Sequence, residues 1–241
     1  MRIRIEPNWH QAIVGTTGSG KTTLEKILAQ SYAATLNLRK APMYYQIFIL
    51  DTKHDGDFDM LGTKYHHIQQ IFQDRRSRIV IYEPWDEEDR PEFYELFLRM
   101  VWDRWMMVPG KSQKSRVPAV VLIDELTTLE IKSGNKSILD PKRTHAWSEI
   151  MKRGRSAHVV LWNVTQNPVY VPEDFFRNAS AFFMFRLNRI DDRKRMAEFM
   201  GTEVLQEIPT NYPHGFWYYH TGGGNMIHPA FIPQLNVVGI R

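Results

Sequence analysis

The sequence has 241 residues, of which 43% are apolar and 24% are charged, as in an ordinary globular protein that can bury a full core. No segment approaches the roughly 20 consecutive apolar residues of a membrane span, and the lack of cysteine excludes disulfides and thiolate metal sites. The net charge of +4 permits a nucleic-acid partner without indicating one. The first residues carry no signal-peptide pattern, so we expect a cytoplasmic protein that is not integral to a membrane.

Six short apolar runs alternate with helix-length stretches along most of the chain. The runs are continuous, as in strands buried on both faces, and they cover residues 10–14, 45–50, 78–82, 119–123, 158–164 and 181–187. Helices are expected over residues 22–37, 90–107 and 145–153. This order predicts an α/β fold with a mostly parallel sheet flanked by helices.

The C-terminal residues have a different pattern. Residues 215–220 and 225–231 are strand-like and flank a glycine-rich turn at 221–224, which predicts a short β-hairpin. We therefore expect a core over residues 1–210 and a hairpin appendage over residues 211–241 that packs on the core.

Residues 15–22 match the pattern G-x-x-x-x-G-K-[ST], between the first expected strand and the first expected helix. The glycines let backbone N–H groups surround a phosphate chain, and the helix N-terminus adds a partial positive charge. In such a loop Lys21 reaches the β- and γ-phosphates, Thr22 binds Mg²⁺ and Thr23 hydrogen-bonds the α-phosphate. The sequence therefore predicts an ATP site made of Gly15, Thr16, Thr17, Gly18, Ser19, Gly20, Lys21, Thr22 and Thr23.

An acidic pair follows the apolar run at residues 119–123. Asp124 and Glu125 would lie at the carboxyl end of a buried strand, where ligands bind in open α/β sheets. This is the Walker B pattern, in which Asp124 holds Mg²⁺ and Glu125 polarises the attacking water.

Two further segments carry polar groups that suit phosphate chemistry. The apolar run at 158–164 ends in Thr165-Gln166-Asn167-Pro168, and we expect Gln166, or in second place Thr165, to contact the γ-phosphate or its water. Arg155 follows the helical stretch at 145–153, and it is a candidate arginine finger for a neighbouring subunit. A helix C-terminus that simply favours cations is the alternative for Arg155.

The order of these motifs resembles the FtsK/HerA superfamily of DNA-pumping ATPases. Asp51-Thr52-Lys53 is similar to the Asp-x-Lys end of that superfamily's second strand. The segment from Arg153 to Pro168 resembles its Gly-Arg-(small) helix end and Thr-Gln-x-Pro strand end. The resemblance implies a RecA-like fold of the additional-strand, catalytic-glutamate type. It also implies that Arg155, with Arg153 second, is the trans-acting finger and that Gln166 is the sensor.

The chain also departs from the larger members of that superfamily. Because the P-loop begins at residue 15, we expect a bare ATPase core, without an N-terminal barrel or a DNA-orienting domain. Such a core looks most like the genome-packaging ATPases of tailless, membrane-containing icosahedral viruses. That likeness implies a hexameric or pentameric ring that threads double-stranded DNA into a preformed capsid. It also implies a capsid or membrane vertex protein as a partner and association with the virion.

A DNA-translocating ring must grip phosphates without reading sequence. The polar stretch at residues 131–143 is the first candidate for this contact, through Lys132, Lys136, Lys142 and Arg143. A second basic stretch, with Lys111, Lys114 and Arg116, precedes its strand and so ranks lower.

Two other functions remain open from the sequence. One is an assembly, secretion or conjugation ATPase that does not translocate DNA. The other is a P-loop kinase for a small molecule, with residues 189–195 as an arginine lid, although Glu125 favours water as the acceptor.

Overall fold

A computed structural model describes residues 2–4, 9–35, 46–74, 76–106, 119–129, 145–208, 214–221, 228–231 and 236–238. Its strands are β1 (Arg2–Arg4), β2 (Gln11–Val14), β3 (Gln46–Leu50), β4 (Thr63–Tyr65), β5 (Ile79–Tyr82), β6 (Ala119–Ile123), β7 (Val159–Thr165), β8 (Ala181–Phe185), β9 (Gly215–His220), β10 (His228–Phe231) and β11 (Asn236–Val238). Its α-helices are α1 (Lys21–Thr35), α2 (Ile68–Gln73), α3 (Pro91–Met106), α4 (Ala146–Ala157), α5 (Glu173–Asn178) and α6 (Ile190–Met200).

Nine of the described strands form one sheet, in the order β10-β9-β8-β2-β7-β6-β3-β5-β4. From β8 to β4 all neighbours are parallel, whereas β9 and β10 pair antiparallel. The strand β7 lies between β2, which leads into the P-loop, and β6, which leads into Asp124. This order confirms the predicted RecA-like, additional-strand arrangement.

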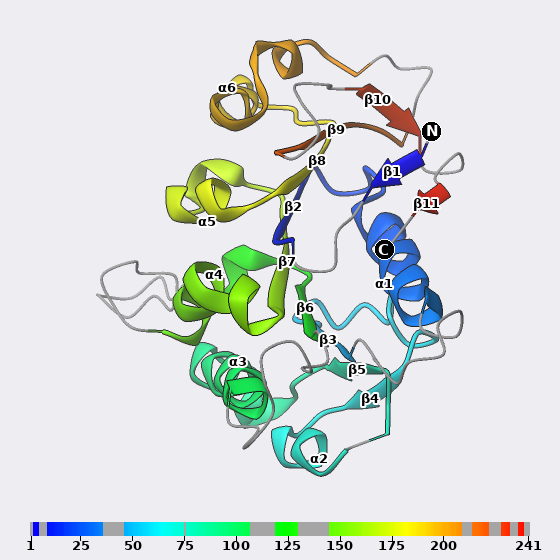
Figure 1. The fold of residues 1–241 in the computed structure, drawn as a ribbon, viewed down its shortest axis with the longest axis vertical. Helices are drawn as coiled ribbons and strands as arrows, with labels where there is room; N and C mark the ends of the chain where they lie inside the picture. The colour runs from blue at the N-terminus through cyan, green and yellow to red at the C-terminus, as the bar shows by residue number, and fades with distance from the viewer. Residues whose placement is uncertain are drawn as a thin grey trace.

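Helices cover both faces of the sheet, with α1 on one side and α2 to α5 on the other (Figure 1). Every residue of β2, β6, β7 and β8 is accordingly buried. This explains the continuous apolar runs, because a strand covered on both faces has no solvent side on which to alternate. Two separate apolar clusters fill the two interfaces, one of them built around α1.

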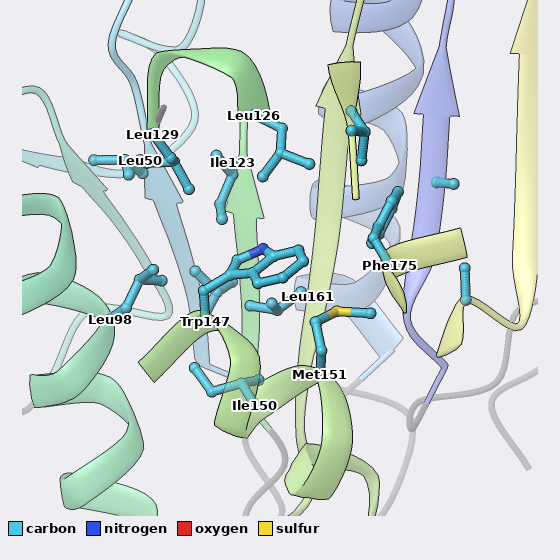
Figure 2. Packing of buried hydrophobic residues seen from close by; sticks show 14 of the residues in the cluster. Leu50, Leu98, Ile123, Leu126, Leu129, Trp147, Ile150, Met151, Leu161 and Phe175 are labelled. Atoms are coloured by element: carbon cyan, nitrogen blue, oxygen red, sulfur yellow. The ribbon is translucent and has the colours of Figure 1, made fainter. Parts of the chain in front are cut away.

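The larger cluster includes Trp147 of α4. Its indole ring lies against the sheet close to Leu161 and Met151 (Figure 2). The ring is 1% exposed, and its Nε1 donates to Asn163 Oδ1 at 3.5 Å. Burial of a side chain this large stabilises the fold by roughly 2–3 kcal/mol, and it fixes α4 against the strand that carries Gln166.

The end of α4 differs from the prediction. The helix continues through Gly154 to Ala157, four residues beyond the predicted end at residue 153, so Arg155 lies in its last turn rather than after it. The position requires glycine, because a β-carbon on Gly154 would collide with the carbonyl oxygen of Val159. The helix stops at His158, which adopts a left-handed conformation with φ 59°.

The predicted C-terminal hairpin is confirmed by β9 and β10. Its first strand pairs with β8, so the hairpin extends the main sheet. The strands β1 and β11 pair with each other in a separate two-stranded sheet. The division into a core ending at residue 210 and an appendage stays a prediction. The predicted start of the second hairpin strand, residue 225, lies outside the described residues, and β10 is described from His228. The other predicted boundaries differ from the observed ones by at most two residues; for example, β8 ends at Phe185 rather than at residue 187.

Candidate nucleotide and acid site

The P-loop is held in place by the strands on either side of β2. The Gly15 N–H donates to the carbonyl of Thr165 at 3.2 Å, and the Thr16 N–H donates to that of Arg186 at 2.9 Å. A β-carbon on Gly15 would lie 2.5 Å from Phe185 Cβ, so no larger residue fits beside β8. Gly18 and Gly20 take positive φ angles of 72° and 105°, which let the loop turn into α1.

Lys21 occupies the interior of this loop. Its Nζ donates to the carbonyl oxygens of Gly15 at 2.8 Å and Thr16 at 2.9 Å, and its side chain is buried. Burial lowers the pKa of Lys21, and the nearby cation of Lys53 lowers it further. The lysine is therefore positioned before any anion arrives.

Three other P-loop side chains differ in exposure. Thr22, the predicted Mg²⁺ ligand, is half-buried at the start of α1, and Thr23 beside it is exposed. The hydroxyl of Ser19 is buried and has no hydrogen-bond partner in the described part of the chain.

The acidic pair follows β6, which lies two strands away from β2 in the sheet. Like the P-loop, the pair lies at the carboxyl ends of the parallel strands. Asp124 is 1% exposed, and its Oδ1 lies 2.8 Å from Nζ of Lys53, at the end of β3. Glu125 is also buried, and its Oε1 accepts a hydrogen bond from Thr127 Oγ1 at 2.7 Å. The other oxygens, Asp124 Oδ2 and Glu125 Oε2, are buried without a partner among the described residues.

The pKa values of both members of the Lys53–Asp124 ion pair are raised. Burial lowers the pKa of Lys53, but the carboxyls of Asp124, Glu25 and Glu125 together outweigh burial, so the net shift is upward. Burial raises the pKa of Asp124, and here Lys53 only partly compensates. Burial therefore affects the pKa of Asp124 more than its attraction to Lys53 does.

Asp51 adds another buried acid to the same edge. Burial raises the pKa of Asp51 to about 6, although the Lys53 backbone N–H donates to its Oδ1 and opposes the shift. The Asp-x-Lys motif therefore has two roles: its aspartate shapes the turn, and its lysine reaches Asp124.

Gln166 lies at the carboxyl end of β7 and contacts the P-loop directly. Its Oε1 accepts a hydrogen bond from Thr17 Oγ1 at 2.7 Å. Both residues line a cavity of about 330 Å³ whose other walls come from the loop after β8 and the start of α6. Thr165, the second choice, is buried and instead caps the following turn, with Oγ1 accepting from the Asn167 N–H.

Arg155 lies away from this site. It is exposed near the amino end of β2, where its charge acts on the buried ring of His10. The P-loop follows the opposite end of that strand, so Arg155 does not join the site of its own chain. Arg153 is exposed on the same helix. The predicted DNA-contacting residues Lys132, Lys136, Lys142 and Arg143, and the lower-ranked Lys111, Lys114 and Arg116, lie outside the described residues.

Sequence reasoning missed three groups at this edge. Glu25 of α1 is fully buried beside Asp124, Thr127 orients Glu125, and Arg189 lines the cavity next to Gln166. Glu25 had a usable signal, since it is an acid between the apolar helix positions Leu24 and Leu28. Thr127 contacts Glu125 from two residues further along the chain, whereas the position of Arg189 follows from tertiary placement.

The described residues set limits on other kinds of site. They contain no group of three or more His, Asp or Glu side chains arranged to hold a metal ion by themselves. None of their helices has the length and apolar character that a bilayer crossing requires.

The strand order, together with the P-loop and the acids at the carboxyl ends of the parallel strands, defines a P-loop protein of the RecA-like, additional-strand class. No protein-family model matches the chain. The chain is 24% identical to the DNA packaging ATPase P9 of Enterobacteria phage PRD1, in an alignment over 253 positions that covers all of this chain and 95% of that protein.

Solved structures extend the comparison. The genome packaging NTPase B204 of Sulfolobus turreted icosahedral virus 2, in complex with AMPPCP, superposes with a TM-score of 0.66 at 19% identity, covering 93% of this chain and 97% of that one. The pCW3 conjugation coupling protein TcpA gives a TM-score of 0.60 at 17% identity, covering 95% of this chain and 62% of TcpA. The resemblance predicted from the motifs is confirmed by these matches.

Proposed function

We propose that this protein is an ATPase motor that moves double-stranded DNA, and that its task is to package a viral genome into a preformed capsid. The observation that carries the proposal is the juxtaposition of the P-loop with two buried acids, Asp124 and Glu125, across the inserted strand β7. The full-length likeness to a phage packaging ATPase gives that chemistry its biological setting.

The P-loop residues bind and orient the triphosphate in this account. Backbone N–H groups of residues 15–22 surround the phosphates, and the helix N-terminus adds its dipole. Lys21 exchanges its contacts with the Gly15 and Thr16 carbonyls for phosphate oxygens.

The acids fit a magnesium ion. Asp124 Oδ2 is buried and unpartnered among the described residues, and Thr22 supplies a hydroxyl from the start of α1. Oxygen donors of this kind suit Mg²⁺, which takes its remaining ligands from phosphates and water. When bound, the ion would neutralise charge that develops on the phosphates.

Glu125 is the residue that accepts the proton of the attacking water. Thr127 holds its Oε1, which leaves Oε2 as the buried acceptor. Carboxylates act as general bases when the proton lies within hydrogen-bond reach. Gln166, tied to the P-loop through Thr17, is placed to contact the γ-phosphate or that water.

Arg155 supports a ring in which neighbouring subunits share each site. It lies at the opposite edge from its own P-loop, and it has no ion-pair partner among the described residues. In a hexamer or pentamer it would stabilise the transition state of the adjacent subunit. A packaging ring requires a capsid or vertex protein as its partner. The ring would act in the host cytoplasm.

A conjugation or secretion ATPase is the second candidate, and the likeness to TcpA favours it. The small-molecule kinase has less support. Arg193 and Arg195 pair with Glu207 and Glu198 on and beside α6, so these arginines are engaged at the protein surface rather than forming a lid.

ATP hydrolysis measured with and without linear duplex DNA separates these functions. We expect stimulation by duplex DNA that weakens as salt is raised, because phosphate contacts release counterions. A rate indifferent to DNA would favour the assembly or secretion ATPase. Activity that requires a small acceptor would identify a kinase.

A further inference from the structure

Glu25 is a buried acid that the proposed mechanism does not use. It lies three residues after Thr22 on α1, and this spacing puts the two side chains on the same helix face. The side chain is 0% exposed, and in the part of the chain that the structure describes its carboxylate oxygens meet the Asp124 carboxyl but no donor group of another residue. Such a group is strongly unfavourable in a protein interior unless something compensates for it.

The charged groups around Glu25 belong to the site formed by the P-loop, Lys53 and the acid Asp124. The carboxyl groups of Glu25 and Asp124 are both buried and lie within hydrogen-bonding range of each other. Lys53 and Lys21 are the nearby cations, but Lys53 is already engaged with Asp124 Oδ1, and Lys21 with P-loop carbonyls. Three carboxylate oxygens, two from Glu25 and Oδ2 from Asp124, therefore receive no hydrogen bond from a lysine or any other donor residue among the described ones.

We propose that Glu25 is a positioning residue of the magnesium site, where it accepts hydrogen bonds from water molecules bound to the ion. This inference rests on the proposed function, because it requires a metal–nucleotide complex at the P-loop. Mg²⁺ gives up its waters reluctantly and usually binds through one or two carboxylates. Those waters carry the donors that the three oxygens lack, and outer-shell acceptors orient metal ligands in many proteins.

The geometry also explains why Glu25 belongs to the ion and not to catalysis. Glu25 is fully buried with its carboxyl beside that of Asp124, whereas Glu125 has its own orienting partner in Thr127. Glu25 is therefore associated with the residue expected to hold the metal, and Glu125 is held separately for the attacking water.

Metal affinity tests the proposal without relying on turnover. Mn²⁺ would replace Mg²⁺, and its electron paramagnetic resonance signal would report free ion as protein and ADP are titrated. We expect Glu25→Gln to weaken Mn²⁺ binding about 10-fold or more, as loss of outer-shell partners does, while metal-free ADP binding is unchanged. The matched control is Glu92→Gln, the same change at an exposed position in the first turn of α3.

Thermal unfolding gives a second readout. Metal-free Glu25→Gln should melt at or above the wild-type temperature, because a buried acid next to another acid is removed, yet gain less stability from Mn²⁺ and ADP. If Glu25→Gln does not fold, Glu25→Asp withdraws the carboxylate and should also weaken Mn²⁺ binding.

The outcomes divide clearly. If the Glu25 variant that folds binds Mn²⁺ as tightly as the wild-type protein, the residue has a purely structural role and the proposal is overturned. Failure of the wild-type protein itself to bind Mn²⁺ with ADP would instead refute the nucleotide site, and with it the proposed function.

Discussion

Thr17 Oγ1 donates a hydrogen bond to Gln166 Oε1 at 2.7 Å, and this contact joins the P-loop to the end of the strand inserted beside it. The two residues are 149 positions apart in sequence. We therefore expect a movement of the P-loop around a phosphate to change the position of Gln166, and a change at Gln166 to alter the P-loop. A hydrolysis sensor requires coupling of this kind.

Gln166→Ala should reduce ATP turnover about 10²-fold, on the scale of losing one oriented hydrogen-bonding group, with a much smaller effect on ATP affinity. Steady-state hydrolysis and fluorescent-nucleotide binding measure the two quantities. Gln69→Ala on the exposed face of α2 is the control. Equal losses of affinity and turnover would mean that Gln166 only shapes the loop.

Glu125→Gln should keep nucleotide binding while turnover falls by orders of magnitude, because the amide retains the shape of the side chain but accepts no proton. Single-turnover hydrolysis is the measurement, with Glu203→Gln at an exposed position as the control. Unchanged turnover would remove Glu125 from the role of base.

Arg155 should act on a neighbouring subunit. Mixing inactive Arg155→Ala with inactive Glu125→Gln chains should restore part of the activity, because some interfaces then combine an intact acid pair with an intact arginine. Mixing Glu125→Gln with Lys21→Ala provides the control, since each site then keeps its own defect. Absence of rescue at every mixing ratio would argue against a shared site.

His10 should make the fold sensitive to acid. Its ring is fully buried with Nδ1 accepting the Leu161 N–H, and burial, aided by Arg155, lowers its pKa from 6.5 to about 3. Between these values the unfolded chain binds a proton that the folded chain does not, so stability falls as pH falls. At pH 5 the loss from this group is about 2 kcal/mol.

Denaturant unfolding at pH 7 and pH 5 measures this effect. Wild-type protein should lose about 2 kcal/mol more than His10→Asn across that interval, since asparagine keeps a hydrogen-bonding group but does not titrate. The carboxylates are the same in both proteins and cancel in the comparison. Identical losses would show that His10 is not the responsible group.

The sequence correctly predicted those helices and strands whose own residues are enough to determine their secondary structure. The strand β6 was predicted at its observed bounds because all five of its residues are apolar and buried. Short mixed strands such as β4, with one exposed and two half-buried residues, lack that signal and depend on pairing with β5. The helix α6 was missed because its stretch is rich in charge, and only its packing against η5 (Pro168–Tyr170) and η6 (Thr202–Leu205) selects it.

The site divides in the same way. The P-loop and the acid pair have fixed local spacing, so they were predicted residue by residue. The Lys53–Asp124 ion pair joins positions 71 apart, and it arises because β3 and β6 are parallel neighbours that end together. Contacts of this kind follow from strand order, which a single sequence does not encode locally.

The rate of ATP hydrolysis by Lys21→Ala, compared with wild type at saturating ATP, tests the central claim most directly. Lys21 is buried in the P-loop against the Gly15 and Thr16 carbonyls, and no other lysine of the described P-loop can take its place. We predict that hydrolysis falls to background, while the melting temperature without nucleotide stays close to that of wild type. Hydrolysis at the wild-type rate would contradict the nucleotide site and the motor built on it.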